Sequence, residues 1–349
     1  MHKFDYSFLD NGLLPASLVN ITSSITSLKT MEDFRKNDFR TIFTELESIA
    51  KIQSVKSSNE IEGIITSDDR IIQIVNQNSS PLNHDETEIA GYRDALNLIH
   101  NNHQVLNFSQ NTIQELHKIM LSSTDYQYGG KYKTENNVIL EIDNQGNRKI
   151  RFSPVPAEET SKAMEQLELA YLDAYGNSNI NQLLLIPCVI LDFLCIHPFK
   201  DGNGRMSRLL SLLLLYKNGF DAGKYISFEE QINKNKAWYY EALHASSENW
   251  HENKNTYFAF MQQFLTTLYF CYQELDKRFA VINSKKINKT TRIEETVLNS
   301  ILPISKSEIC KILPDVSPTT VEAVLSKMLK SNLITTLGSG RATKYIKKQ

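Results

Sequence analysis

The stretch that decides the fold lies between two apolar runs and reads His197-Pro198-Phe199-Lys200-Asp201-Gly202-Asn203-Gly204-Arg205-Met206-Ser207-Arg208. The first run extends from Leu183 to Ile196, and the second from Leu209 to Tyr216. Gly202 and Gly204 interrupt helical and strand periodicity, so the pattern predicts a helix, a tight glycine loop and a second helix. Glycines that accept positive φ let successive backbone N–H groups face one cavity, and we therefore expect an anion-binding concavity.

The side chains around this loop suit a bound polyphosphate. A helix that begins near Asn203 adds unpaired N–H groups and the positive end of its dipole. Arg205 and Arg208 are three residues apart and share a helix face, so both can reach phosphate oxygens. Asp201 offers a hard oxygen ligand for Mg²⁺. His197 can accept a proton from an attacking hydroxyl, and the positive helix end favours the neutral imidazole that a base requires.

The same positions carry a family resemblance. The motif His-x-Phe-x-Asp/Glu-Gly-Asn-Gly-Arg-x-x-Arg of the Fic family is filled at every specified position, by His197, Phe199, Asp201, Gly202, Asn203, Gly204, Arg205 and Arg208. The resemblance implies adenylylation, in which AMP passes from ATP to a Ser, Thr or Tyr hydroxyl of a target protein, or of the enzyme itself, and pyrophosphate is released. It implies that His197 is the base, Asp201 the Mg²⁺ ligand, Gly202 to Arg205 the phosphate cradle, and Arg208 a ligand of the terminal phosphate.

A second match lies N-terminal to this motif, where Ser58, Glu62 and Gly63 have the spacing Ser-x-x-x-Glu-Gly. Taken alone, the segment predicts a helix that ends at a glycine C-cap, with Glu62 as a solvated acid. It also resembles the inhibitory helix of many Fic proteins. That resemblance implies that Glu62 pairs with Arg208 and occupies the guanidinium that the γ-phosphate needs, so it predicts a self-inhibited enzyme.

A short hairpin is predicted between the Ser58–Gly63 segment and the His197–Arg208 motif, because the strand-like segments 138–142 and 149–152 flank turn residues at 143–147. It resembles the Fic flap, which holds the target segment as an added strand. We assign Lys149 and Phe152 to the nucleotide site on this basis. Val155 departs from the family's usual sequence pattern, which has a second proline at this position.

The sequence Trp238-Tyr239-Tyr240 has two interpretations. As an aromatic stripe at helical spacing it predicts core packing. It is also similar to a Tyr-Tyr segment that borders the nucleotide base in Fic proteins, which implies that Tyr239 or Tyr240 stacks on adenine.

Residues 285–349 resemble a winged helix-turn-helix module, because three short helical patterns precede a glycine-rich hairpin pattern. This segment holds 12 basic and 5 acidic residues, a net charge of +7. The positive charge suits DNA, but winged helices also dock proteins, and the sequence leaves both partners open.

Composition argues against several other kinds of protein, namely polyanion-binding, zinc-binding, disulfide-linked and membrane-spanning ones. The 349 residues include 38 basic and 40 acidic ones, so whole-chain affinity for polyanions is not expected. The four cysteines lack Cys-x-x-Cys spacing and predict reduced thiols rather than zinc or disulfide sites. The most apolar window, 183–196, is about half a membrane-spanning length and contains Asp192, so it predicts a buried core helix. No signal-peptide core precedes it, and a cytoplasmic location without membrane contact is expected.

We therefore expect a mainly α fold: a Fic-type helical bundle with a β-hairpin flap, plus a C-terminal winged-helix domain. The predicted domains are an N-terminal helical region with the inhibitory helix (1–110), a Fic catalytic core (111–284) and the winged helix-turn-helix (285–349). In the helix predicted at 84–100, we expect Glu86, Glu88 and Arg93 on the solvent side.

Two alternative functions keep the same fold. One is a DNA-binding regulator whose Fic core only senses a nucleotide, and the other is a Fic enzyme that removes AMP or transfers another phosphate-containing group. A P-loop ATPase is not indicated, because the sequence contains no Walker loop. The oligomeric state, including a homodimer, is left open.

Overall fold

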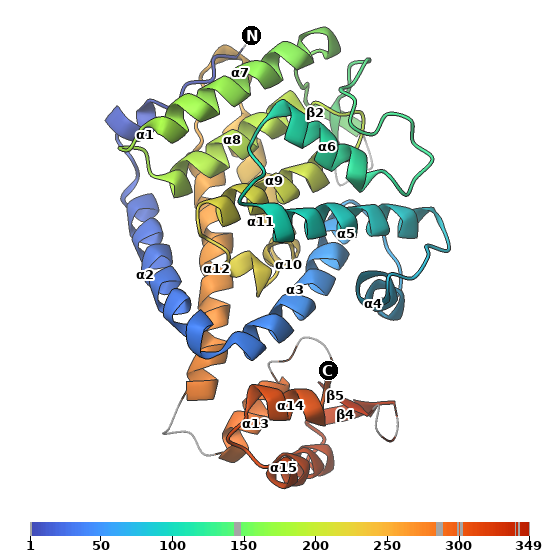
Figure 1. Ribbon diagram of the computed structural model, residues 1–349. Helices are drawn as coiled ribbons and strands as arrows, with labels where there is room; N and C mark the ends of the chain where they lie inside the picture. The colour runs from blue at the N-terminus through green and yellow to red at the C-terminus, as the bar shows by residue number, and fades with distance from the viewer. Residues whose placement is uncertain are drawn as a thin grey trace. The chain divides into compact units, whose positions relative to one another are not determined.

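The computed structural model describes residues 2–142, 148–283, 289–298, 300, 303–338, 340 and 343–348. Within these ranges the chain is mainly helical with two small antiparallel sheets, as predicted (Figure 1). The predicted hairpin turn at 143–147, residues 284–288 around the predicted start of the C-terminal module, and positions 339 and 341–342 of the glycine-rich loop lie outside the described residues.

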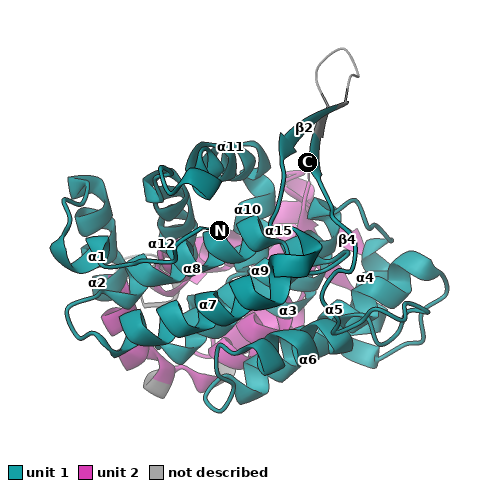
Figure 2. Ribbon diagram, turned by 90° about the horizontal axis from the view of Figure 1, so that it is seen from above, with its two compact units in different colours: residues 1–27, 50–271 teal, residues 28–49, 272–349 magenta. Residues whose placement is uncertain are grey.

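The chain divides into two compact units (Figure 2). Unit 1 comprises residues 1–27 and 50–271, and unit 2 comprises residues 28–49 and 272–349. This division differs from the predicted domain boundaries, because residues 28–49 and 272–283 group with the C-terminal segment.

Most helices belong wholly to unit 1, whereas three continue from one unit into the other. The continuing helices are α2 (Ala16–Asp38), α3 (Arg40–Ile61) and α12 (Phe258–Asn283). Unit 1 also holds α1 (Phe8–Asn11), α4 (Asp68–Gln77), α5 (His84–Asn102), α6 (Gln110–Met120), α7 (Ala157–Gly176), α8 (Gln182–Ile196), α9 (Asn203–Lys217), α10 (Phe228–Lys234) and α11 (Lys236–Ser247). Its two strands, β1 (Ile139–Ile142) and β2 (Arg148–Phe152), form the predicted hairpin.

Helix α8 is the core helix of unit 1. All of its residues except Gln182 and Leu194 are buried, and it packs against α7 and α9. A helix that is apolar on every side must be covered on every side, which explains this central position. None of the described helices is both long enough and apolar enough to cross a membrane.

Helix α5 corrects one prediction. The three side chains expected on its solvent side, Glu86, Glu88 and Arg93, are all buried. Each is buried because it has a partner: Glu86 pairs with Arg70 of α4, Glu88 pairs with Arg205 of α9, and Arg93 donates to the Ile74 carbonyl at 2.8 Å. Helical spacing alone does not distinguish such paired charges from solvated ones.

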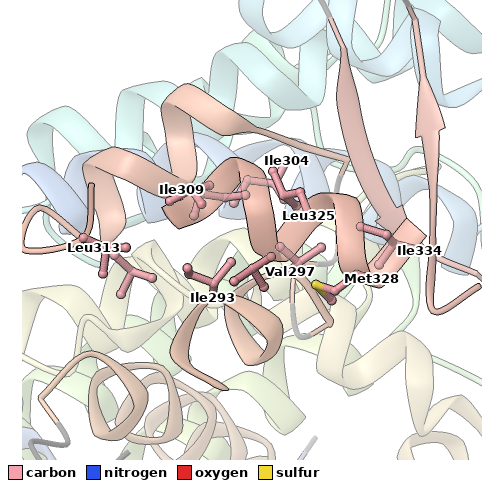
Figure 3. Packing of buried hydrophobic residues seen from close by; sticks show 11 residues of the cluster. Ile293, Val297, Ile304, Ile309, Leu313, Leu325, Met328 and Ile334 are labelled. Carbon is pink, nitrogen blue, oxygen red and sulfur yellow. The ribbon is translucent and has the colours of Figure 1, made fainter. Parts of the chain in front are cut away.

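The C-terminal part of unit 2 contains three helices and a three-stranded sheet of order β3-β5-β4. The elements are α13 (Lys289–Leu298), β3 (Ile304–Ser305), α14 (Lys306–Ile312), α15 (Pro318–Lys330), β4 (Ile334–Leu337) and β5 (Lys344–Lys347). Ser305 and Glu308 form a capping box at the start of α14. The buried side chains form one apolar cluster (Figure 3) that includes Ile293, Val297, Ile309, Leu325 and Met328.

Candidate active site

The motif begins where α8 ends. His197 is the C-cap of α8 and has φ 52° and ψ 60°, a left-handed conformation that is uncommon for a residue other than glycine. Gly202 has φ 78° and starts α9 as its N-cap. This backbone angle favours glycine, and a Cβ atom on Gly202 would also lie 2.6 Å from Met120 Cε, the end of a flexible side chain that would have to shift. The predicted helix, glycine loop and helix are therefore present.

The Asn203 side chain closes the loop from within. Its Oδ1 accepts a hydrogen bond from the Phe199 N–H at 2.9 Å, and its Nδ2 donates to the Phe199 carbonyl at 2.8 Å. Among the described residues, no side chain caps the first turn of α9. The first N–H groups of α9 therefore stay available to a bound anion.

This end of α9 forms one wall of a cavity of about 620 Å³. The other walls come from the β1–β2 hairpin, from α8 and from α11, together with the end of α3. The lining includes Glu62, Val138, Ile139, Leu140, Arg151, Phe152, Leu194, His197, Lys200, Asp201, Gly202, Asn203, Gly204, Arg208, Tyr239, Tyr240 and Leu243.

Most of the residues predicted for the site meet in this cavity, but three of the described ones do not line it. Arg205 is buried beneath the loop, where it pairs with Glu88 and lies 3.4 Å from Asp201 Oδ2. Lys149 is solvent-exposed on β2. Ser58 lies behind Arg208 and accepts a hydrogen bond from its Nε at 2.8 Å.

Arg151 is a cavity residue that the sequence analysis missed. The hairpin register shifts between Ile139, which faces Phe152, and Leu140, which faces Ile150, so Arg151 is an extra residue on β2. Such a bulge interrupts the alternation of faces, and Arg151 and Phe152 both line the cavity. Arg151 Nη2 also donates to the Tyr240 carbonyl at 2.9 Å, which connects the hairpin to α11. No glycine or other turn signal in the sequence marks this bulge.

His197 is neutral at physiological pH. Burial lowers its pKa to about 4, and the nearby charge of Lys133 lowers it further, while a hydrogen bond to the Leu194 carbonyl opposes both. The sequence analysis predicted the neutral form from the helix dipole, but burial is its main cause. Because a carbonyl can only accept, the 3.2 Å contact from Nδ1 to Leu194 O means that Nδ1 carries the proton. Nε2 therefore keeps its lone pair.

Glu62 and Arg208 form an ion pair inside the cavity. Arg208 Nη2 donates to Glu62 Oε1 at 2.8 Å and to the Ser58 carbonyl at 2.8 Å, and the guanidinium side chain is only 2% exposed. Burial raises the pKa of Glu62, but the charge and hydrogen bond of Arg208, together with the charges of Arg205 and Lys236, outweigh this and keep the pKa below its usual value. A Cβ atom on Gly204 would collide with Glu62 Oε1, so the carboxylate lies directly against the start of α9.

The backbone after α3 explains how Glu62 is presented. Gly63 has φ 84°, and the Ile64 N–H donates to the Asn59 carbonyl at 3.0 Å. This is the glycine C-cap that the sequence predicted. The helix ends at Ile61, and Glu62 follows in the turn with its side chain one-third exposed.

Comparison with known proteins shows similarity to one family. Residues 107–215, about a third of the chain, match the family model of the Fic/DOC family. The similar proteins described next carry names from the same family.

Two curated proteins are similar over short segments. Protein adenylyltransferase fic-1 of Caenorhabditis elegans is 29% identical over 110 residues, which is 31% of this chain and 19% of the relative. A Fido domain-containing protein of Dictyostelium discoideum is 34% identical over 64 residues, which is 18% of this chain and 41% of that protein. The matches thus span less than half the length of either relative.

Solved structures extend the likeness in fold. A Fic family protein from Desulfovibrio desulfuricans has a TM-score of 0.63 at 17% identity, covering 96% of this chain and 97% of that one. A Fic domain containing signaling protein from Bacteroides thetaiotaomicron has a TM-score of 0.58 at 21% identity, covering 75% and 97%. Fic-1 of C. elegans has a TM-score of 0.57 at 18% identity, covering 76% and 73%. At these identities the likeness shows the shared fold.

Proposed function

We propose that this protein is a self-inhibited protein adenylyltransferase, which transfers AMP from ATP to a hydroxyl side chain of a target protein or of itself. The observation that carries the proposal is one cavity with three components. It holds a neutral His197, the uncapped start of α9, and an Arg208 whose guanidinium is already paired with Glu62.

The reaction needs a base and an anion site next to each other, and the cavity offers both. His197 Nε2 accepts the proton of the attacking hydroxyl while the oxygen bonds to the α-phosphorus of ATP. The bond from that phosphorus to the bridging oxygen breaks, and pyrophosphate leaves with the electron pair. The N–H groups at the start of α9 and the Arg208 guanidinium hold the phosphates. Tyr240 and Leu243 offer an apolar wall for the adenine ring of ATP.

The metal requirement fits the donor set. Asp201 lines the cavity, and its carboxylate is 53% exposed, so an oxygen is available to a cation. No cluster of three metal-binding side chains occurs among the described residues. A single carboxylate suits Mg²⁺, which takes its remaining ligands from phosphate oxygens and water. Asp201 would hold the ion, which would offset the charge of the phosphates.

Glu62 supplies the proposed inhibition. Its carboxylate occupies the guanidinium edge of Arg208 and lies against Gly204, so a phosphate at the same place would meet a negative charge at contact distance. An ATP molecule must therefore displace Glu62 before its terminal phosphate reaches Arg208.

The test is to compare two labelled forms of ATP with the Glu62→Gly protein. Label in the α-phosphate should become covalently attached to protein, whereas label in the γ-phosphate should not. The Glu62→Gly, His197→Ala protein should acquire neither label. Attachment of γ-label would identify a phosphoryl transferase instead, and release of AMP from pre-modified protein without any attachment would favour hydrolytic removal of AMP.

A second proposal concerns residues 289–348. The helix pair α14–α15, followed by β4 and β5, has the element order of a winged helix. Several of its cations already have acidic partners, including Arg292 with Asp315 and Lys306 with Glu322, both at 2.7 Å. We therefore favour a protein partner over DNA. Binding of duplex DNA that weakens steeply with salt would contradict this preference.

A further inference from the structure

Four carbonyl groups in and just before the motif loop contact residues outside the loop. The Ile196 carbonyl accepts from Lys133 Nζ at 3.1 Å, and the Pro198 carbonyl accepts from the Lys133 N–H at 2.8 Å. The Phe199 carbonyl accepts from Asn137 Nδ2 at 3.2 Å. The Asp201 carbonyl contacts His117 Nε2 at 3.1 Å.

His117 has a defined tautomer at this contact. Its Nδ1 accepts a hydrogen bond from the Gly130 N–H at 2.9 Å, so Nε2 carries the proton and donates it to the Asp201 carbonyl. The ring is fully buried and stacks on Phe199, with centroids 3.7 Å apart and planes at 6°. Burial lowers the pKa of His117 to about 4, so this neutral tautomer persists at physiological pH.

Lys133 has no charged partner in these contacts. Its side chain is buried, and its Nζ donates to two neutral oxygens, those of Asn137 Oδ1 at 2.8 Å and the Ile196 carbonyl. A buried ammonium group held only by neutral oxygens costs stability, because burial disfavours its charge. Such a cost indicates a role other than packing.

The geometry of a trans peptide bond suggests how residues that hold carbonyl groups can orient the N–H groups of the loop. The C=O and N–H of one peptide unit point in opposite directions, and the described chain contains no cis peptide bond. With the Asp201 carbonyl held by His117, the Gly202 N–H must point away from His117. Gly202 lines the cavity, whereas His117, Lys133 and Asn137 are not among its described lining residues. Asn137 and His117 hold the carbonyls of the peptides that carry the Lys200 and Gly202 N–H groups, so these two N–H groups turn toward the other face, where the cavity lies. The peptides held by Lys133 are closed within the fold, because the His197 N–H donates to the Phe193 carbonyl and the Phe199 N–H to Asn203 Oδ1.

We propose that His117 and Asn137, with Lys133 holding the Asn137 amide, form a clamp on the carbonyl side of the loop, which fixes the Gly202 and Lys200 N–H groups in the orientation that binds phosphate. They are positioning residues, since they act through the loop and do not line the cavity. The clamp rests on the proposed function, because it assumes that the first turn of α9, which forms one wall of the cavity, binds the phosphates of a nucleotide.

The test compares the affinities of the full-length protein for ATP and for adenosine by calorimetry. Two variants remove clamp donors while keeping side-chain size: His117→Phe, which retains the stacking on Phe199, and Lys133→Met. Lys131→Met, an exposed change two residues from Lys133, is the matched control. Lys133→Arg retains charge and donors and should rescue binding.

We expect His117→Phe and Lys133→Met to weaken ATP binding about tenfold, the effect of misplacing one hydrogen bond to a charged group, and to leave adenosine binding unchanged. Unchanged ATP binding would overturn the clamp, and so would equal weakening of ATP and adenosine, which indicates general damage to the fold. If a variant does not fold, Asn137→Asp gives the same comparison at a more peripheral donor.

The two proposals fail differently. If the Glu62→Gly protein, in which no carboxylate opposes the phosphates, binds ATP no more tightly than adenosine, the cavity is not a phosphate site, and the proposed function falls together with the clamp. If ATP binds more tightly than adenosine but all clamp variants match the control, only the clamp is wrong.

Discussion

At His197, the backbone and the burial act together on one imidazole. The left-handed backbone conformation ends α8 and places the ring in the cavity wall, while the Leu194 carbonyl fixes the proton on Nδ1. Strained conformations of this kind persist where the surrounding structure enforces them, commonly at functional sites. The result is a base that is already neutral and oriented before substrate arrives.

The low pKa of His197 predicts that the transfer rate falls at a lower pH than it would with an ordinary histidine as the base. A base with a pKa of about 4 remains largely deprotonated at pH 5, whereas an ordinary histidine would be mostly protonated there. Transfer by the Glu62→Gly protein with bound ATP should therefore hold nearly constant from pH 7 to pH 5.5. The measurement is kcat against pH, and a midpoint near 6.5 would contradict the assignment.

Replacing His197 by alanine should separate chemistry from binding. Loss of a general base typically costs about 10²- to 10⁴-fold in rate, and the phosphate contacts do not use the imidazole. We expect transfer to fall by that factor while the dissociation constant for ATP changes little. A rate within a fewfold of the parent protein would show that another group takes the proton.

Part of the residue-level site could be predicted from the sequence. The helix, glycine loop and helix follow from local spacing, whereas the pairing of Glu62 with Arg208 was expected only from the family resemblance, because the two residues lie far apart in the chain. Arg205 was expected at the phosphates, but its guanidinium is buried against Glu88, a partner 117 positions earlier in the chain. Arg151 faces the cavity only because of a bulge in the hairpin register. Both facts depend on tertiary packing, which local patterns do not encode.

At the level of elements, α5 holds the segment that follows α3. Its Glu86 accepts from Arg70 Nε at 3.0 Å and Nη2 at 2.7 Å, from Thr66 Oγ1 at 3.0 Å and from the Leu82 N–H at 2.8 Å. Arg70 lowers the pKa of Glu86 to about 2, so this carboxylate stays charged. These contacts limit how far the end of α3 can move.

Weakening this attachment should loosen the inhibition. Glu86→Gln keeps the shape but loses the charge that holds Arg70, and we expect the basal transfer rate to rise about 3- to 10-fold. The exposed Asp69→Asn on α4 is a control that should leave the rate unchanged. Equal rates for both variants would mean that α5 does not restrain the segment.

For the whole molecule, buried titratable groups set the response to acid. His117 and His197 have pKa values of about 4 in the folded chain and near 6.5 when unfolded. Between these pH values the unfolded chain binds more protons, so their contribution to stability is lost as pH falls. Asp192 acts in the opposite sense, because burial raises its pKa to about 7 and the folded chain gains a proton there first.

Two histidines against one carboxylate predict a net loss of stability below neutral pH. The melting temperature should fall between pH 6.5 and pH 4.5, and His117→Phe should make the fall shallower, since that group no longer titrates. Thermal melts followed by fluorescence would measure both. A melting temperature that rises over this interval would show that Asp192 dominates.

The central claim is that Glu62 holds a competent adenylyltransferase closed through Arg208. If that pair biases the closed state by about 2–3 kcal/mol, its removal gives roughly 30- to 150-fold more productive complex. Glu62→Gln removes the charge alone and should activate in the same direction. Glu60→Gln, two residues away and hydrogen-bonded to Asn233, should have no effect.

The most direct measurement is the initial rate of AMP attachment for the unmodified protein, Glu62→Gly, Arg208→Ala and the double variant. The account predicts that Glu62→Gly is faster than the unmodified protein by that 30- to 150-fold factor, and that this gain is absent when Arg208 is also replaced, because the freed guanidinium is then missing. A rate for Glu62→Gly equal to that of the unmodified protein, or an equal gain with and without Arg208, would contradict it.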